Sequence, residues 1–119
     1  MKESMKSFYK YNASDEELFT YIRINAGEWN EQSFIQMKKI VGEVMKDYQD
    51  EDYYPKAFVS YFIRNIPSVI NILSGCKRCS DEEIQKGYTE ETYLSMIAER
   101  IEELKKLQLE FSLSLNRKE

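Results

Sequence analysis

The clearest pattern of apolar and polar positions follows Asn30 and continues to about Tyr48. Apolar residues recur there at spacings of three and four, which places them along one face of an α-helix. The stripe consists of Phe34, Met37, Val41, Val44 and Tyr48, with Ile40 and Met45 beside it. Because the Asn30 side chain can accept a hydrogen bond from the first helical turn, we predict an amphipathic helix that begins after Asn30.

The tetrapeptide Ser-Asp-Glu-Glu occurs at residues 14–17 and again at residues 80–83. In each copy the serine side chain can accept a hydrogen bond from the backbone N–H three residues later, and the second glutamate can reach back, which forms a capping box. The first copy predicts a helix from Ser14 to near Gly27, since glycine commonly follows a helix end. The second copy predicts a short helix from Ser80 to near Gly87.

Pro55 predicts the start of another helix, because proline suits the first helical position. This helix is apolar on most sides, so we expect it to lie centrally in the fold. Its apolar residues are Phe58, Val59, Tyr61, Phe62, Ile63 and Ile66. Pro67 predicts either a kink or a new short helix that ends near Gly75. The apolar stretch over residues 57–73 is shorter than the ~20 residues of a membrane-spanning helix, and we expect no membrane association.

A last, long helix is predicted to begin at Thr89. Thr89 is a suitable N-cap, and Tyr88 and Tyr93 have the spacing of a hydrophobic staple, in which side chains on either side of the cap pack together. The buried stripe consists of Tyr93, Ile97, Ile101 and Leu104. Apolar and polar residues then alternate strictly over residues 107–115, which is the period of a strand. Leu, Gln and Glu favour helix, so we predict a helix buried on two sides and keep a strand as the alternative.

Together these patterns predict an all-α protein, a single-domain bundle of four to five helices over residues 1–119. The length suits one domain, and folding at this size removes roughly two thirds of the unfolded chain's surface from water. Only 4 Gly and 2 Pro interrupt the chain, which fits long helices joined by short connections.

The composition argues against several classes of function. The formal net charge is −4 and there is no long basic run, whereas proteins that hold nucleic acid neutralise its phosphates with Lys and Arg. Histidine is absent, which removes the commonest general base near neutral pH and the commonest metal ligand. We therefore expect no enzyme activity, no cofactor or metal, and no direct contact with nucleic acid.

The two cysteines lie close together, at Cys76 and Cys79. Two thiolates are half of a tetrahedral zinc site, and no histidine or second cysteine pair completes it. A redox pair is expected after a strand in a βαβ unit, which this pattern lacks. We interpret them as reduced thiols, which fits a cytoplasmic protein, as does the absence of an apolar run at the start. A dimer that shares a four-cysteine zinc site is the alternative.

Residues 47–54 are the strongest candidate for a functional surface. They contain four carboxylates and three tyrosines and no basic residue. Like charges this close repel one another, so they are expected to face solvent or a cationic partner. Tyrosine offers a large, stiff contact surface, and clustered acid steers a basic partner. A soluble interhelical loop with tyrosines in the core is the simpler alternative.

Asp50-Glu-Asp-Tyr53-Tyr54-Pro55 resembles the Asp-x-x-Tyr-Tyr-Pro segment of the nuclease-colicin immunity proteins, and the predicted helices before it are laid out similarly. The resemblance covers about the first half of the chain. It implies a small four-helix bundle whose acidic second helix and Tyr-Tyr segment bind a nuclease domain and protect the producing cell. On matching positions it implies binding roles for Asp50, Tyr53 and Tyr54 and a structural role for Pro55.

The segment after Pro55 is apolar here and polar in that family, so we predict an immunity or inhibitor protein in the broad sense. Its partner is expected to be a basic toxin or nuclease domain. The predicted partner-binding residues are Glu43, Asp47, Tyr48, Asp50, Glu51, Asp52, Tyr53 and Tyr54. The alternative is a self-associating helical regulator or adaptor, a homodimer whose seam lies on the C-terminal helix.

Overall fold

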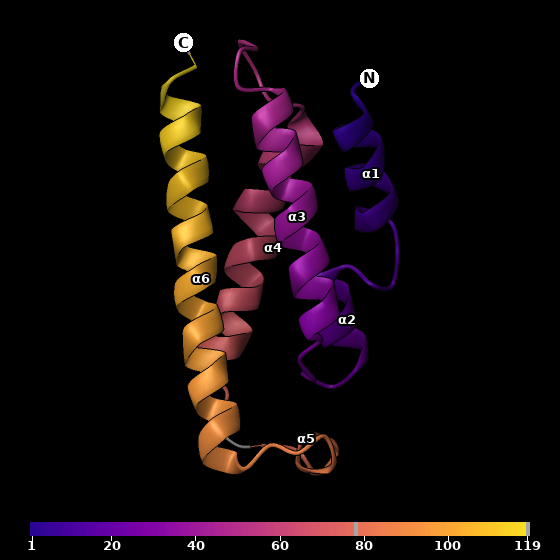
Figure 1. Ribbon diagram of the computed structural model, residues 1–119, viewed down its shortest axis with the longest axis vertical. Coiled ribbons are helices and arrows are strands. Elements are labelled where there is room, and N and C mark those ends of the chain that lie inside the picture. The colour runs from indigo at the N-terminus through magenta and orange to yellow at the C-terminus, as the bar shows by residue number, and fades with distance from the viewer. Residues whose placement is uncertain (78, 119) are drawn as a thin grey trace.

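The computed structural model describes residues 1–77 and 79–118, and within them it contains helices and no strand (Figure 1). The six helices are α1 (Glu3–Asn12), α2 (Leu18–Ile24), α3 (Glu31–Asp47), α4 (Lys56–Ser74), α5 (Asp81–Gln85) and α6 (Glu90–Asn116). The all-α prediction is therefore confirmed. The predicted number of four to five helices is too low, because α1 was not among them.

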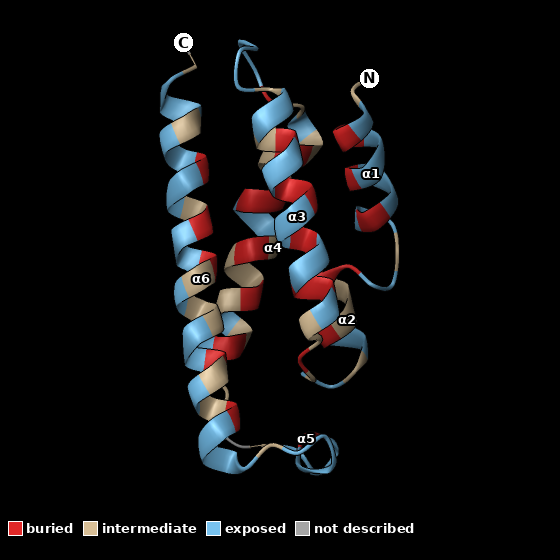
Figure 2. Cartoon of the chain, viewed as in Figure 1, coloured by how far each residue is buried: buried red, intermediate tan, exposed pale blue. Residues whose placement is uncertain are grey.

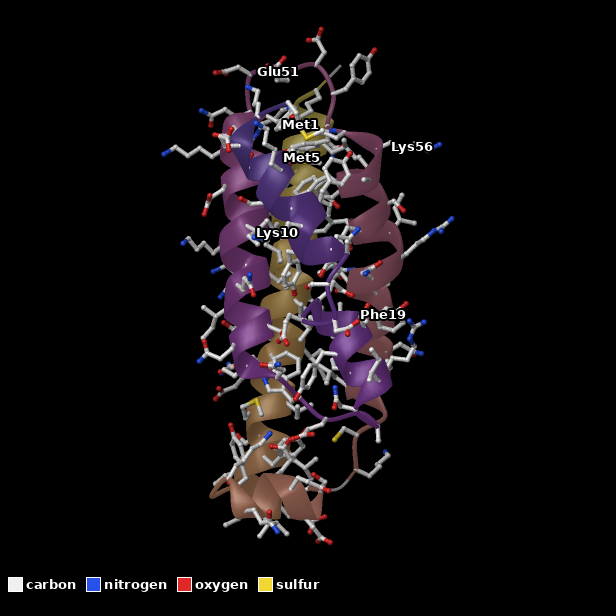
Figure 3. The ribbon with its side chains drawn as sticks, turned by 90° about the vertical axis from the view of Figure 1, so that its right-hand side faces the viewer. Met1, Met5, Lys10, Phe19, Glu51 and Lys56 are labelled. Atoms are coloured by element: carbon white, nitrogen blue, oxygen red, sulfur yellow. The ribbon has the colours of Figure 1, made fainter. Side chains whose placement is uncertain are left out.

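The helices form an elongated bundle with principal extents of 46 × 25 × 19 Å. α6 packs against α4, α4 packs against α2, and α3 packs against both α1 and α2. α1 and α2 follow one another along the same side, so together they occupy one position in the bundle (Figure 3). α5 lies across the end opposite the two chain ends (Figure 1).

α1 escaped prediction because its start carries no capping signal. The N-cap residue is Lys2, whose side chain forms no capping hydrogen bond. The helix is nevertheless amphipathic, since Met5, Phe8 and Tyr11 are buried against the rest of the bundle. Tertiary burial of this face, rather than a local start signal, stabilises α1.

The predicted capping box at residues 14–17 is wrong, and α2 begins at Leu18 instead. Ser14 Oγ donates to Tyr11 O (2.8 Å), so it belongs to the turn that ends α1. Glu17 itself is the N-cap: its carboxylate accepts hydrogen bonds from the backbone N–H groups of Phe19 (3.0 Å) and Thr20 (2.9 Å). Glu17 is fully buried, and Tyr61 of α4 donates its hydroxyl proton to the same carboxylate (2.8 Å).

The other predicted helix starts are confirmed. Asn30 caps α3 by accepting from Ser33 N (3.1 Å), and Ser80 caps α5 by accepting from Glu83 N (3.2 Å). Thr89 caps α6 in a capping box. The Tyr88 and Tyr93 rings beside that cap lie 5.4 Å apart, as a hydrophobic staple requires.

α4 continues through Pro67 as one helix to Ser74, so of the two alternatives predicted at the proline, a new short helix is not realised. The predicted helix buries Phe58, Tyr61 and Phe62, whereas Ile63 is 67% exposed. α4 packs against α2 and α6, and Phe8 of α1 contacts its Phe58 and Tyr61 rings, whereas the side that carries Ile63 is exposed to solvent.

Residues 107–115 are helical, so the strand alternative is not realised. Leu107 and Phe111 face α4 and are buried, whereas Leu109 and Leu113 are 59% and 48% exposed. The prediction of burial on two sides is therefore wrong, because nothing in the described chain covers the outer side of α6 (Figure 2).

Aromatic rings and ion pairs hold α6 in place. Phe111 stacks on Phe62 of α4, with ring centroids 4.1 Å apart. Arg100 Nε donates to Glu31 Oε1 (2.8 Å) across the gap between α6 and α3. This hydrogen bond to Arg100 holds the pKa of the Glu31 carboxyl below its usual value. None of the helices in the described ranges combines the length and the apolarity that crossing a bilayer requires.

Candidate functional site

The 47–54 segment connects α3 to α4 at the end of the bundle where both chain ends lie (Figure 1). Figure 3 shows Glu51 on this connection, with Met1 and Lys56 at the same end of the molecule. The C-terminal end of α3 leads into the segment, and Pro55 is the N-cap of α4 on its other side. The segment is therefore a short loop held between two long helices.

The structure separates the predicted site residues into an exposed and a buried group. The exposed residues are Glu43, Asp47, Asp50, Glu51, Asp52 and Tyr53. Tyr53 is 79% exposed, the highest value among the large apolar and aromatic side chains. Within the described part of the chain, the side chains of Asp50, Asp52 and Tyr53 form no hydrogen bond and no ion pair. We call these three residues the apical patch.

Tyr54 belongs to the core and not to the surface. It is 6% exposed, and its hydroxyl donates to Ser114 Oγ of α6 (2.8 Å). Its ring lies 5.2 Å from Phe58 and 5.4 Å from Phe111, measured between centroids. The half-buried Tyr48 packs beside it at 6.4 Å. Of the two adjacent tyrosines, only Tyr53 is available to a partner.

Two lysines from opposite ends of the sequence contact this loop, and the sequence pattern gave no sign of them. Lys2 Nζ donates to Asp47 O (2.6 Å) and lies 3.1 Å from Glu51 Oε1. Lys118 Nζ donates to Glu51 O (2.8 Å) and to Tyr48 O. Part of the loop's negative charge is thus neutralised within the molecule.

Both lysines also lie over tyrosine rings. Lys2 Nζ is 5.1 Å from the centroid of Tyr48, and Lys118 Nζ is 4.4 Å from the centroid of Tyr54. An ammonium group above an aromatic face is attracted by the ring quadrupole. Each lysine ammonium group therefore contacts at least one backbone carbonyl oxygen of the segment and, at the same time, the face of a tyrosine ring.

A second candidate region lies at the opposite end of the bundle, around α5. A pocket of about 490 Å³ is lined there by Asn25, Ala26, Gly27, Glu28, Ile72, Cys76, Lys77, Ser80, Glu82 and Tyr93. Cys79 is half-buried nearby, and its Sγ donates to Ser80 O (3.6 Å). No group of three or more His, Cys, Asp or Glu residues in the described ranges has an arrangement suited to a metal ion.

Glu83, beside this pocket, is a buried carboxylate with incomplete hydrogen bonding. It is 2% exposed, and its Oε1 accepts no hydrogen bond from the residues that the structure describes, although Lys86 Nζ lies 3.7 Å away. Lys86 is hydrogen-bonded to Glu28 Oε1 (2.5 Å), which ties α5 to the loop before α3. Burial raises the pKa of the Glu83 carboxyl.

We expect Glu83→Gln to raise the melting temperature at pH 7 by about 2 to 4 °C. A carboxyl whose pKa is higher in the folded than in the unfolded chain destabilises the fold as it ionises, so the contribution of Glu83 to wild-type stability falls as pH rises above about 4. The two proteins should therefore melt together at pH 3 and separate towards pH 7. Thermal unfolding followed by circular dichroism measures this, and a wild type that is the more stable at pH 7 would contradict it.

Comparison with known protein families, with curated proteins and with solved structures gives no match. The resemblance to the nuclease-colicin immunity proteins therefore remains a prediction carried by residues 50–55. Among these, Asp50 and Tyr53 are exposed, Tyr54 is buried, and Pro55 starts α4.

Proposed function

We propose that this chain is a small acidic binding protein without catalytic activity, which neutralises a basic protein partner through the apical patch. A bacterial toxin, such as a nuclease domain, is the partner class we favour, and we assign the protein to the cytoplasm. The observation that carries the proposal is the exposed Tyr53 (79% exposed), which directly follows the exposed acidic residues Asp50 and Asp52 in the same loop. Glu43 and Asp47 extend the acidic surface along α3.

The patch is well placed to act as a binding anchor. Tyrosine has few rotatable bonds, so little conformational entropy is lost when its ring is immobilised in an interface. The backbone beside it is fixed, because Tyr54 is buried in the core and Pro55 begins α4. A rigid aromatic side chain on a fixed backbone supports binding without a large ordering cost.

The charges around Tyr53 favour a basic partner. Asp50 and Asp52 are exposed and lack a cation within the described part of the chain. Exposed charges of one sign speed the encounter with an oppositely charged surface, and the effect weakens as salt increases. A nuclease presents such a surface, because its active site binds phosphate.

We take the product of the gene encoded just upstream as the candidate toxin. We expect the double charge reversal Asp50→Lys/Asp52→Lys to weaken binding to this protein about 10-fold to 100-fold at low salt. The remaining affinity should depend less on salt than that of the wild type, because the steering charges are lost. Isothermal titration calorimetry at two salt concentrations measures both quantities.

Glu102→Lys/Glu99→Lys is the matched control, since it makes the same change in net charge on exposed positions of α6. Equal losses of affinity in both double variants would show that only net charge matters, and would contradict the proposal that the partner binds at the apical patch.

A second candidate function, self-association, is favoured by one observation on α6. Leu109 and Leu113 lie one turn apart on its outer side and are 59% and 48% exposed. Residues four apart on a helix share a face and can form a seam with a second copy. A homodimer formed this way would suit a helical regulator or adaptor.

Replacing both leucines, as Leu109→Gln/Leu113→Gln, is expected to convert such a dimer to a folded monomer, because neither side chain is buried within one chain. Light scattering during gel filtration measures the mass. Ile35→Gln, at a similarly exposed position of α3 (53%), is the control and should leave the mass unchanged. A wild type that is monomeric at millimolar concentration removes this candidate.

A further inference from the structure

We propose that Lys2 and Lys118 compete with lysine side chains of the partner for two ammonium-binding sites at the end of α3. In the free protein Lys2 and Lys118 occupy these sites, and on binding the partner's lysines replace them. This inference rests on the proposed function, because it concerns the same end of the molecule. It identifies the partner's contact segment as lysine-rich.

The two sites are built from acceptors that suit an ammonium group. The last carbonyl groups of a helix lack intrahelical partners and lie at the negative end of the helix dipole. At the end of α3 these include Asp47 O, which accepts from Lys2, and Tyr48 O, which accepts from Lys118. A tyrosine ring completes each site, at 5.1 Å from Lys2 Nζ and 4.4 Å from Lys118 Nζ.

The chemistry favours lysine over arginine in the incoming segment. The acceptors at each site are separate oxygen atoms, such as Asp47 O and one oxygen of Glu51 for Lys2. An ammonium group has three donors that rotate to meet such points. A guanidinium group binds best to a carboxylate presented edge-on with both oxygens, whereas Lys118 contacts carbonyl oxygens and Lys2 contacts one carbonyl oxygen and one carboxylate oxygen.

The exposure of Lys2 allows it to be displaced. The side chain of Lys2 is 40% exposed and that of its partner Glu51 is 52% exposed. Ion pairs this exposed contribute little to stability. Asp50 and Asp52, which form no ion pair within the described ranges, lie in the same loop, so a basic segment bound to the apical patch is close to the two ammonium sites.

The test compares binding of octalysine, a basic peptide of eight lysines, to the full chain and two double variants at low salt. Lys2→Gln/Lys118→Gln empties the sites, and Lys105→Gln/Lys106→Gln changes two exposed lysines of α6. Each pair lowers the net charge from −4 to −6, so the two variants are matched in overall charge. We expect the first pair to bind octalysine at least about five-fold more tightly than the second.

Equal affinity of the two variants for octalysine overturns the inference, and so does weaker binding by Lys2→Gln/Lys118→Gln. If wild type and the first variant bind equally well through Asp50 and Asp52, the inference fails while the proposed function stands. If no protein binds octalysine, both fail. Binding by the first variant alone supports the inference.

A measurement on the wild type tests the same inference without a variant, so it does not depend on whether the substituted proteins fold. In protein labelled with ¹⁵N at lysine side chains, saturating octalysine should shift the Nζ signals of Lys2 and Lys118 to those of free, solvated ammonium groups. The Nζ signal of Lys86, which contacts Glu28 at the other end of the bundle, should stay unchanged. Unchanged signals of Lys2 and Lys118 in the presence of bound peptide would show that these lysines are not displaced.

Discussion

Tyr54→Ala is expected to lower the free energy of unfolding by about 3 to 5 kcal/mol, the usual cost of removing a large aromatic side chain from a core. Tyr54 is 6% exposed and lies between Phe58 and Phe111, so its removal leaves a cavity where α4 meets α6. The variant also leaves Ser114 Oγ without the hydroxyl that donates to it.

The adjacent Tyr53→Ala is the matched control, and it should change stability by less than about 0.5 kcal/mol, because the side chain is exposed. Urea unfolding followed by far-ultraviolet circular dichroism gives both values. A similar loss of stability in the two variants would mean that the two tyrosines do not divide into a core residue and a surface residue.

Glu17→Ala is expected to lower the free energy of unfolding by about 3 kcal/mol, because one buried carboxylate satisfies donors from two helices. It caps α2 through the backbone N–H groups of Phe19 and Thr20, and it accepts the hydroxyl of Tyr61. Burial raises the pKa of Tyr61 well above its usual value, so this hydroxyl stays protonated and needs an acceptor. Alanine would leave these donors buried and unpaired.

The exposed neighbour Glu16→Ala should cost less than about 0.5 kcal/mol, since its side chain forms no hydrogen bond or ion pair within the described part of the chain. Tyr61→Phe, which removes one hydrogen bond to Glu17, should fall between the two. Chemical denaturation of all three proteins tests this order. A Glu17→Ala protein as stable as Glu16→Ala would contradict the role of the carboxylate as the link between α2 and α4.

Local signals in the sequence predicted those helices whose start is set by their own residues. Asn30, Ser80 and Thr89 cap α3, α5 and α6 through bonds that span three residues, so the pattern alone identifies them. The Ser14–Glu17 pair has the same spacing, yet Glu17 is recruited by Tyr61, 44 residues away. A contact that distant in sequence leaves no local trace, so the start of α2 was misplaced.

For the candidate site, the sequence predicted the exposure of the acidic residues but not the contacts made by residues distant in the chain. Clustered acid indicated exposure, and Asp50 and Asp52 are exposed. The pattern could not distinguish Tyr53 from Tyr54, because the difference arises from Ser114, 60 residues further along. Nor could it foresee Lys2 and Lys118 on the loop, since the bundle brings both chain ends there only when it folds (Figure 1).

The most direct test of the central claim, that the apical patch neutralises a basic toxin, is a growth assay. Cells express the neighbouring gene's product together with wild type, with Asp50→Lys/Asp52→Lys/Tyr53→Ala, or with the α6 control Glu102→Lys/Glu99→Lys. All three proteins must first show equal helicity and melting behaviour. We expect wild type and the α6 control to restore growth and the patch variant to fail. A neighbouring product without toxicity, or full rescue by the patch variant, would contradict the claim.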